Sequence, residues 1–443
     1  MEEEAIKYLR KGKTMVLSTN GESMWAAKVF YCLDEGLVFL VEKNSRTLNN
    51  LIKNDTAVFT IDFNQPDIFI QGTGRVTILG EPRDFHKERG ALLYKIPEDT
   101  LFVKSGHVLI ARLVPDNIRV TDMRGQPAKY DLKIDTKKLT EKRNTRYFRA
   151  LRPWSFQQSV TSLIFGALIA FHIDYPLLLL SIIALLLVHG SFNALSDYFD
   201  FISKTDKPEG MGSAGARILI DRHMPTSTFL VYAISLLLIG TGLGIYLIII
   251  RPVILPYVII GLIAGLLYGL PRLGWKRIAL GDVAVFLAFG PGIFLGSYAL
   301  QGGKFGLPEI LISVSLGLII VAILHGNNWR DIKDDKEAGV RTIANIIGDK
   351  GSEVYFISLI WLSYPLFIVA VVLEPRLFPI LGALLTIPWA VRLTKIANNQ
   401  KNIKRNLLDM LTARFTALHI YFAVIFLIFF MALSFYVPSL HLP

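Results

Sequence analysis

Residues 175–199 read YPLLLLSIIALLLVHGSFNALSDYF, a largely apolar run with Asn193 and Asp197 near its end. An α-helix needs about 20 predominantly apolar residues to cross a bilayer. Comparable segments recur toward the C-terminus. We predict nine spans, at 155–172, 175–199, 228–249, 253–270, 281–300, 308–329, 352–373, 377–395 and 415–438. The sequence therefore predicts an all-α nine-helix transmembrane bundle over residues 151–443.

The overall composition is that of a membrane protein. Hydrophobic residues make up 52% of the 443 residues, charged residues make up 19%, and the mean hydropathy is +0.45. Soluble globular chains are less apolar and carry more charge. Cys32 is the only cysteine, which excludes an intramolecular disulfide, a cysteine zinc site and a cysteine-ligated iron–sulfur cluster.

Residues 1–135 differ from the rest of the chain in their pattern of apolar residues. The apolar runs here are short, β-rich and alternating, at 14–19, 28–31, 37–41, 57–61, 68–70 and 108–110. Turn signals separate them, and Gly72-Thr-Gly74 suits a bulge. Two helices are expected, one capped by Ser45 and one at about 83–94. We predict a small antiparallel β barrel, followed by a basic linker at 136–150.

The net charge of +11 is unevenly distributed along the chain. Residues 1–135 hold 19 basic and 19 acidic residues, so the barrel has no basic surface excess and no nucleic acid partner is expected. If the N-terminus is inside, 19 of the 22 basic residues of 151–443 lie on the cytoplasmic side, in the loops or, for Arg152, before the first span. Arg251, Lys304 and Arg376 fall on the other side. Because cytoplasmic loops are enriched in Lys and Arg, we expect a multi-pass cell-membrane protein with a cytoplasmic barrel and an outside C-terminus.

Two acidic motifs lie at the ends of predicted spans. In Asn193-Ala-Leu-Ser-Asp197-Tyr-Phe-Asp200 the polar residues are spaced i, i+4, i+7, and Asn327, Asp331 and Asp335 are spaced i, i+4, i+8. Each set shares one helical stripe, where like charges repel. Removing one acid should therefore leave the metal-free stability unchanged or raise it. Mg²⁺ binds through carboxylates together with substrate phosphates, so the paired motifs predict a metal–diphosphate clamp.

Two other interpretations compete with the clamp. The acidic residues could simply lie at polar helix ends that the cytoplasm solvates. This interpretation would explain one motif, but it explains poorly two motifs that each carry an Asn one turn earlier. A secondary transporter would place its charges in the middle of broken spans, whereas these acids lie at span ends.

Residues 147–440 resemble the UbiA superfamily of intramembrane aromatic prenyltransferases. The resemblance rests on Arg152-Pro153-Trp154, on the first acidic motif, and on Asn327-Asn328-x-Arg330-Asp331-Ile-x-x-Asp335 followed by Gly339-x-Arg341-Thr342. It implies Mg²⁺-dependent transfer of a polyprenyl group from a polyprenyl diphosphate to an aromatic or lipid acceptor. Asp197, Asp200, Asp331 and Asp335 would act as catalytic metal ligands. The other implied substrate-binding residues are Arg152, Asn193, Lys207, Tyr268, Arg272, Lys276, Asn327, Asn328 and Arg330.

The residues of these motifs are most similar to those of the 1,4-dihydroxy-2-naphthoate polyprenyltransferase branch, which acts in menaquinone biosynthesis. Two positions depart from expectation: Arg272 stands where other branches have Lys, and Asp282 stands where this branch would have Glu. The acceptor therefore stays open between the naphthoate, 4-hydroxybenzoate and a glycerol-phosphate lipid, as in archaeal ether lipid synthesis. Tyr268 fits equally an interfacial aromatic residue.

The first 125 residues or so resemble the split-barrel family of pyridoxamine-phosphate-oxidase-like flavoproteins. The pattern comprises Leu17-Ser-Thr19, Ser45-Arg46-x-x-Asn49-Asn50-Leu51 and Gln71-Gly72-x-Gly74-Arg75-Val76. It implies FMN as a cofactor, with its phosphate near Ser45 and Arg46 at a helix N-terminus. The alternative is an ordinary N-cap beside a solvated arginine, in a barrel kept for docking or regulation.

Overall fold

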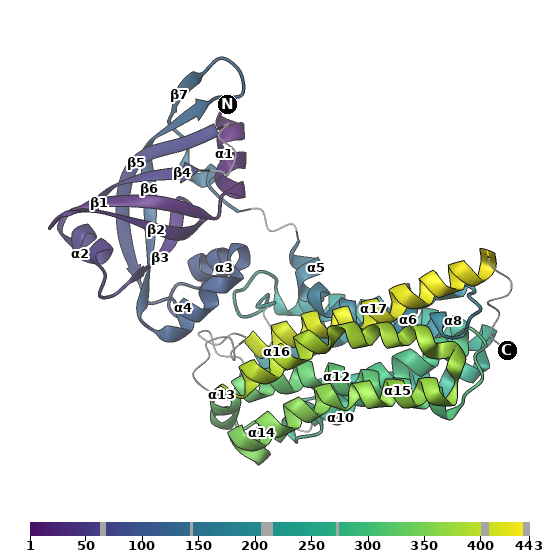
Figure 1. The fold of residues 1–443 in the computed structure, drawn as a ribbon. Coiled ribbons are helices and arrows are strands. Elements are labelled where there is room, and N and C mark those ends of the chain that lie inside the picture. The colour runs from purple at the N-terminus through teal and green to yellow at the C-terminus, as the bar shows by residue number, and fades with distance from the viewer. Residues whose placement is uncertain (63–67, 142–144, 205–215, 272–273, 400–406, 437–443) are drawn as a thin grey trace. The chain divides into compact units, whose positions relative to one another are not determined.

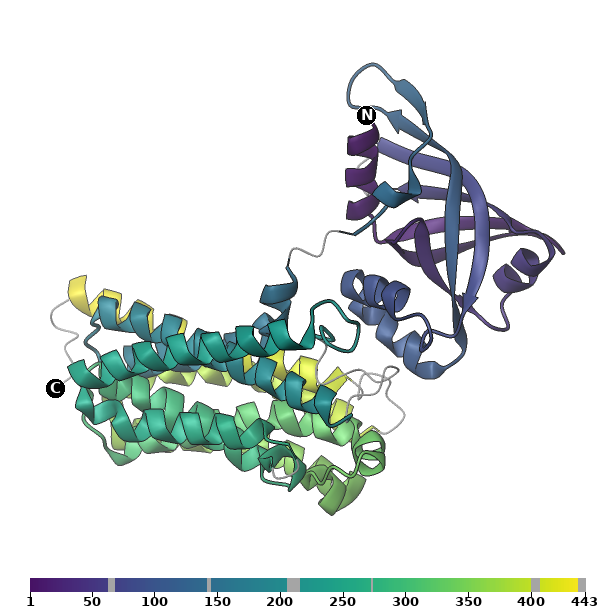
Figure 2. The same cartoon turned by 180° about the vertical axis from the view of Figure 1, so that it is seen from behind.

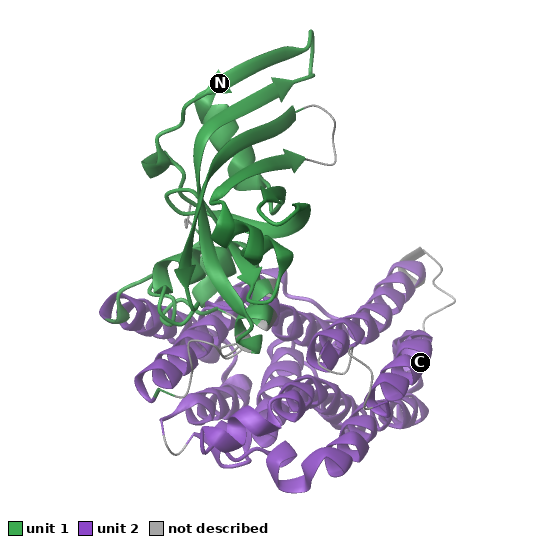
Figure 3. Cartoon of the chain, turned by 90° about the vertical axis from the view of Figure 1, so that its left-hand side faces the viewer, with its two compact units in different colours: residues 1–150, 204–226 green, residues 151–203, 227–443 purple. Residues whose placement is uncertain are grey.

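The computed structural model describes residues 1–62, 68–141, 145–204, 216–271, 274–399 and 407–436 (Figures 1 and 2). The chain divides into two compact units, coloured separately in Figure 3. Unit 1 comprises Met1–Ala150 and Lys204–Thr226, and unit 2 comprises Leu151–Ser203 and Ser227–Pro443. The connection after residue 203 thus belongs to the unit that contains the predicted barrel.

Unit 1 is built on a seven-stranded antiparallel sheet. Its strands are β1 (Thr14–Asn20), β2 (Met24–Leu33), β3 (Leu37–Glu42), β4 (Thr56–Asp62), β5 (Ile68–Gly80), β6 (Val108–Asp122) and β7 (Ala128–Leu132). The order is β3-β2-β1-β4-β5-β6-β7, and β3 also pairs with β6. That extra pairing closes the first six strands into a barrel, as the alternating sequence pattern predicted, while β7 extends β6.

Alternating burial explains why these segments form a barrel. Leu17 on β1, Phe59 on β4 and Ile70 on β5 are fully buried in its interior. The register between β5 and β6 shifts at Thr73/Gly74, which confirms the predicted bulge. A Cβ at Gly74 would lie 2.3 Å from the Val114 carbonyl oxygen, so only glycine allows this approach of the two strands.

Unit 1 also contains short helices. They are α1 (Glu2–Lys11), α2 (Arg46–Lys53), α3 (His86–Lys95), α4 (Thr100–Ser105) and α5 (Arg146–Ala150). The predicted cap of α2 is confirmed, because Leu48 N donates a 3.1 Å hydrogen bond to Ser45 Oγ. The helix predicted at about 83–94 is α3.

Unit 2 is a helical bundle. Its helices are α6 (Phe156–Leu168), α7 (Tyr175–Ile202), α8 (Thr226–Ile250), α9 (Leu255–Gly269), α10 (Gly281–Leu287), α11 (Gly296–Leu300), α12 (Leu307–Arg330), α13 (Ile332–Glu337), α14 (Ile343–Trp361), α15 (Ser363–Leu373), α16 (Ile387–Ala397) and α17 (Leu408–Tyr436). Within the described ranges, eight helical stretches are long and apolar enough to cross a membrane. They are Tyr175–Ile202, Thr226–Ile250, Pro252–Gly269, Gly281–Leu300, Leu307–Arg330, Ile343–Leu373, Pro375–Ala397 and Leu408–Leu433.

The predicted count of nine spans is not confirmed, because the segment predicted at 155–172 forms only the 13-residue helix α6. At 1.5 Å per residue, α6 is about 20 Å long, shorter than the roughly 30 Å hydrocarbon core. Its flanking residues nevertheless lie at opposite ends of the bundle. Arg152 contacts Asp197 near the end of α7, and the backbone N–H of Asp174, which precedes α7, donates to Gln301 Oε1.

Candidate active site

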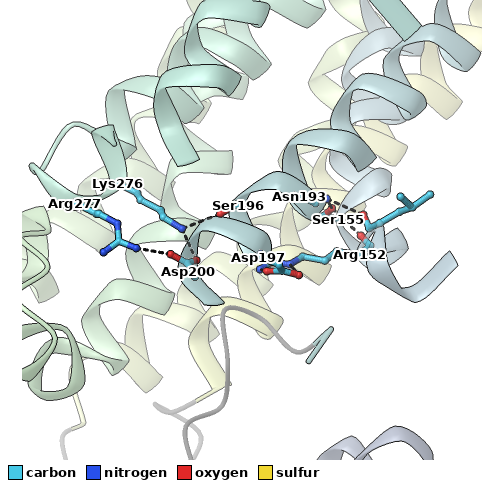
Figure 4. Close-up of polar contacts among 9 residues, drawn as sticks. Arg152, Ser155, Asn193, Ser196, Asp197, Asp200, Lys276 and Arg277 are labelled. Carbon is cyan, nitrogen blue, oxygen red and sulfur yellow. Dashed lines mark hydrogen bonds and ion pairs between the residues drawn. The ribbon is translucent and has the colours of Figure 1, made fainter. Parts of the chain in front are cut away.

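The first acidic motif lies on the last turns of α7, where each polar side chain has an intramolecular partner (Figure 4). Arg152 binds the Asp197 carboxylate through both Nε and Nη2, with Nε 3.3 Å from Oδ2. Asn193 Nδ2 donates to the Leu151 carbonyl oxygen at 2.9 Å and to Ser155 Oγ at 3.0 Å. Asn193 therefore holds the chain that carries Arg152, and Arg152 balances the charge of Asp197.

Asp200 is buried and is neutralised by two cations from the connection between α9 and α10 (Figure 4). Lys276 Nζ lies 2.5 Å from Asp200 Oδ2 and 2.8 Å from Ser196 Oγ, and Arg277 Nη2 lies 2.7 Å from Asp200 Oδ1. Burial lowers the pKa of Lys276, and the nearby Asp200 carboxylate opposes that effect. A buried group of two cations and one anion suits an anionic ligand.

The second acidic motif begins on the last turn of α12. Backbone hydrogen bonds from Asp331 N to Asn327 O and from Asp335 N to Asp331 O keep the three residues in helical register across the start of α13. Arg330 binds the Asp331 carboxylate, with Nε–Oδ1 and Nη2–Oδ2 distances of 2.9 and 2.6 Å. Its Nη2 also donates to Asn327 Oδ1, and its Nη1 donates to Asp409 Oδ2 at 2.7 Å.

The surroundings of Asp335 in the second motif disfavour its charged form. Burial raises its pKa to about 7, and repulsion from Asp331 and Asp334 adds to the effect. Arg330 and Lys276 act in the opposite direction. Lys276 thus binds Asp200 of the first motif and acts electrostatically on Asp335 of the second, so the two motifs face a common region.

The donor chemistry around Asp335 fits a hard cation, since carboxylate oxygens are ligands that Mg²⁺ prefers. In the ranges that the structure describes, no group of three or more His, Cys, Asp or Glu side chains is close enough to hold a metal ion. The predicted acidic clamp is therefore not preassembled. Most of its carboxylates are bound by arginine or lysine side chains instead.

A cavity of about 350 Å³ extends from the first motif into the bundle. Arg152, Asn193, Ser196 and Tyr268 line its polar end. The remainder follows α7 back to Ser181, a length of about 22 Å at 1.5 Å per residue. Its other lining residues are mostly apolar, and they include Gly240, Gly244, Gly261, Gly265, Gly292 and Gly296. A long apolar cavity with the Arg152 guanidinium at its polar end suits a molecule with an apolar chain and an anionic head.

Some polar residues near the site were not identified from the sequence. His189 lines the cavity, and its Nδ1 lies 2.6 Å from Ser159 Oγ. Arg277 shares Asp200 with Lys276, and Asp409 contacts Arg330 from α17. Arg277 follows the predicted Lys276 directly, whereas Asp409 lies far from any motif and only the fold brings it to the site.

Four further residues were predicted to bind the substrate: Lys207, Tyr268, Arg272 and Asn328. Lys207 and Arg272 lie outside the described residues. Tyr268 lines the cavity, with Lys276 Nζ 5.9 Å from its ring centre. Asn328 is half-buried on α12.

In unit 1, Ser45 and Arg46 lie together at the start of α2. Ser45 Oγ caps the helix and donates to the Glu42 carbonyl oxygen at 2.8 Å. The exposed Arg46 guanidinium lies 5.0 Å from the centre of the Trp25 ring. Ser45 is thus the N-cap of α2, and Arg46 is its first residue.

Residues 159–418 match the UbiA prenyltransferase family. The match covers more than half of the chain, and the chain belongs to this family. It is a multi-pass membrane protein and a prenyltransferase.

Proteins with similar sequences carry the same family name. The chain is 31% identical over 262 residues to UbiA prenyltransferase domain-containing protein 1 of Homo sapiens, an alignment of 57% of this chain and 75% of the relative. It is 29% identical over 292 residues to the homolog of that protein in Drosophila melanogaster, covering 64% of this chain and 78% of the relative.

A solved structure has a similar fold. A UbiA homolog from Archaeoglobus fulgidus bound to GPP and Mg²⁺ superposes with a TM-score of 0.50 at 15% identity, covering 64% of this chain and 99% of that chain. The similarity supports the fold of unit 2.

Proposed function

We propose that this prenyltransferase moves a polyprenyl group from a polyprenyl diphosphate to an aromatic acceptor, with 1,4-dihydroxy-2-naphthoate in menaquinone synthesis as the favoured one. The observation that carries the donor assignment is the cavity, whose apolar length ends beside Arg152, Asn193 and Tyr268, next to Asp200 and Lys276. In the proposed complex, the isoprenoid tail lies among small and apolar side chains and the diphosphate lies near these charged groups. The bound GPP of the Archaeoglobus fulgidus homolog supports the same donor class.

In the proposed reaction, the allylic C–O bond of the donor breaks and its electron pair leaves with the diphosphate. Lys276, Arg277 and Arg152 stabilise that departing charge. An electron-rich ring carbon of the acceptor then attacks the allylic carbon, and a C–C bond forms. The same ring carbon then loses the group that it carried, a proton or a carboxylate as carbon dioxide, which restores the aromatic ring. The apolar cavity walls exclude water, which would otherwise capture the allylic cation.

Asp197, Asp200, Asp331 and Asp335 are the proposed Mg²⁺ ligands. Bound Mg²⁺ would supply positive charge that stabilises the leaving diphosphate. Before a metal binds, Arg152 balances Asp197, Lys276 and Arg277 balance Asp200, and Arg330 balances Asp331. We propose that these cations turn from the carboxylates to the diphosphate when the donor and its metal bind. Asn193 and Asn327 keep Arg152 and Arg330 in position through the contacts described above.

The acceptor assignment is tested by competition. The purified full chain is supplied with Mg²⁺, a polyprenyl diphosphate and equal amounts of 1,4-dihydroxy-2-naphthoate, 4-hydroxybenzoate and a glycerol-phosphate lipid, and the products are identified by mass. Prenylated naphthoate is expected as the main product. A glycerol ether as the main product would overturn the aromatic assignment and leave the donor assignment intact.

For the orientation, we propose a cytoplasmic unit 1 and an outside C-terminus, supported by the distribution of Lys and Arg along the loops. A single cysteine is placed beside Lys304 or beside Lys336 after Cys32 has been replaced. The cysteine beside Lys304 should react with an impermeant thiol reagent added outside intact cells, and the one beside Lys336 should not. The reverse labelling would overturn the orientation.

For the barrel, we propose that unit 1 binds the phosphate of FMN at the start of α2. The proposal is supported by the N-terminus of α2 and by Arg46, whose exposed guanidinium lies over the Trp25 ring. The purified chain should then carry or take up FMN and show its visible absorption band. Absence of binding at tens of micromolar FMN would leave the barrel as a docking or regulatory module.

A further inference from the structure

Residues 216–226, a described part of the connection between α7 and α8, pack within unit 1, although both helices lie in unit 2. The segment from Ala216 to Leu219 is buried, together with Asp221, His223 and Met224. Arg217 and Arg222 have φ angles of 51° and 52°, so tight left-handed turns shape this segment. A buried, tightly turned segment is a packed part of unit 1.

An ion pair fixes the segment to helix α3. Arg89 on α3 is fully buried, and its Nε and Nη2 lie 3.1 and 3.0 Å from Asp221 Oδ1. Arg217 binds the same carboxylate, with its Nε 2.9 Å from Oδ2. Arg89 Nη1 also donates to the Pro82 carbonyl oxygen at 3.1 Å. Arg89 and Arg217 thus share one buried carboxylate, and loss of the Arg89 guanidinium would remove the charged hydrogen bonds that join α3 to the segment.

Shape complementarity reinforces the ion pair. A Cβ at Gly90 would lie 2.8 Å from Asp221 Cβ, so only glycine lets α3 approach the segment this closely. Tyr94 packs edge-on against His223 at a ring-centre distance of 5.2 Å. Arg89, Gly90 and Tyr94 of α3 thus all contact the α7–α8 connection.

We propose that unit 1 anchors the α7–α8 connection, and that Arg89 is a positioning residue for binding of the diphosphate donor. Asp197 and Asp200 lie on the last turns of α7, and Ser203, which follows that helix, shares Arg277 with Asp200. At the other end of the connection, α8 supplies Gly240 and Gly244 to the cavity wall. Fixing residues 216–224 to α3 holds the segment that leads directly into α8. This role gives the fused barrel a function that does not depend on any ligand of its own.

Two variants release the anchor in different ways. Arg89→Ala removes the guanidinium, and Gly90→Ala forces Asp221 away while it improves the helix propensity of α3. Arg119→Ala is the matched control, because Arg119 forms an exposed ion pair with Asp131 on the same barrel. Hydrogen exchange is measured on the full chain. Peptides from 216–226 should exchange at least tenfold faster in both variants, and they should exchange at the wild-type rate in the control. Peptides from β1 and β4 should keep the wild-type rate in all three proteins.

The donor part of the proposal rests on the function proposed above and is measured separately, as Mg²⁺-dependent binding of geranyl diphosphate. The dissociation constant should rise about tenfold in Arg89→Ala and Gly90→Ala, and Arg89→Lys should recover part of the loss. Wild-type exchange in 216–226 for both variants would overturn the anchor. Faster exchange with an unchanged dissociation constant would overturn the positioning role. If the wild-type chain bound no geranyl diphosphate, the proposed function would fail while the exchange result still decided the anchor.

Discussion

Arg330 Nη1, on the last turn of α12, lies 2.7 Å from Oδ2 of Asp409, a residue 79 positions further along the chain at the start of α17. The same guanidinium binds both oxygens of Asp331. The last helix of the bundle thus fixes the cation that holds an acid of the second motif. Asp409 therefore acts on the site through Arg330.

Asp409→Ala should lower kcat/KM about tenfold and reduce the free energy of unfolding by about 1–3 kcal/mol, the usual contribution of a hydrogen bond to a charged group. Steady-state kinetics and thermal unfolding of the detergent-solubilised chain measure both effects, and Asp409→Glu should restore part of the rate. Asp131→Ala is the control, since exposed ion pairs contribute little. Unchanged kinetics in Asp409→Ala would show that Arg330 does not need this support.

Asp197→Asn and Asp331→Asn should each abolish prenyl transfer, because each removes a proposed metal ligand. The repulsion expected from the sequence predicts unchanged or higher stability for these variants. The structure changes that expectation, since Asp197 balances Arg152 and Asp331 balances Arg330. We now expect a loss of about 1–3 kcal/mol in metal-free buffer. Near-normal turnover at saturating Mg²⁺ in either variant would refute the ligand assignment.

Asp335 should make the metal-free protein less stable as the pH rises. Its pKa is raised from 3.8 to about 7 on folding, so the folded state binds the proton more tightly than the unfolded state. The free energy of unfolding therefore falls between these two values and stays lower above pH 7. In Asp335→Asn, melting temperatures measured in chelator from pH 4 to pH 8 should show a flatter slope and a higher value at pH 8. An identical pH profile for both proteins would contradict this assignment.

The sequence predicted the architecture well where the signal is local. Period-two alternation predicted the barrel strands, Ser45 predicted a cap, and apolar length predicted the spans from 175 onward. The first span was overestimated because apolar residues continue past Leu168, where α6 ends and Phe171 has a φ of 55°. The short helices α1 and α4 and the strand β7 were not predicted, although Ala5, Ile6 and Leu9 of α1 form a buried stripe at helical spacing.

Long-range pairing could not be predicted from motif spacing. From the sequence, the carboxylates were expected to bind a metal. In the structure, Asp197 binds Arg152, which lies 45 positions earlier, and Asp200 binds Lys276, which lies 76 positions later. Only the packing of α6, α7 and the α9–α10 connection brings these residues together. The same holds for Asp221, which binds Arg89 from 132 positions away.

Arg46→Glu should abolish FMN binding to unit 1 and leave prenyl transfer unchanged. The substitution replaces a cation that donates hydrogen bonds to the phosphate with an anion that repels it. The barrel should stay folded because Arg46 is exposed and follows the cap of α2. Absorbance titration with FMN and a transferase assay are run on the same preparation, with Arg119→Glu as the control. Loss of transfer in Arg46→Glu would show that the start of α2 is coupled to the membrane unit, which we do not expect.

Gly244→Leu should shorten the prenyl chain that the enzyme accepts. Gly244 lines the cavity on α8, near the end remote from the acidic motifs, and a Cβ there meets no atom within 4 Å. A leucine side chain would therefore extend into space proposed for the distal isoprene units. With a long polyprenyl diphosphate, KM should rise at least tenfold, whereas the kinetics with geranyl diphosphate should change less than twofold.

Gly242→Leu is the matched control for this substitution. Gly242 lies two residues away on the same helix, its built Cβ also meets no atom within 4 Å, and the residue is exposed on the outside of the bundle. Both variants lose a helical glycine, so any shared change reflects helix propensity and not the cavity. Equal chain-length profiles for Gly244→Leu, Gly242→Leu and wild type would show that the donor tail lies elsewhere. Loss of activity with both short and long donors in Gly244→Leu alone would instead mean that the side chain disturbs the diphosphate end.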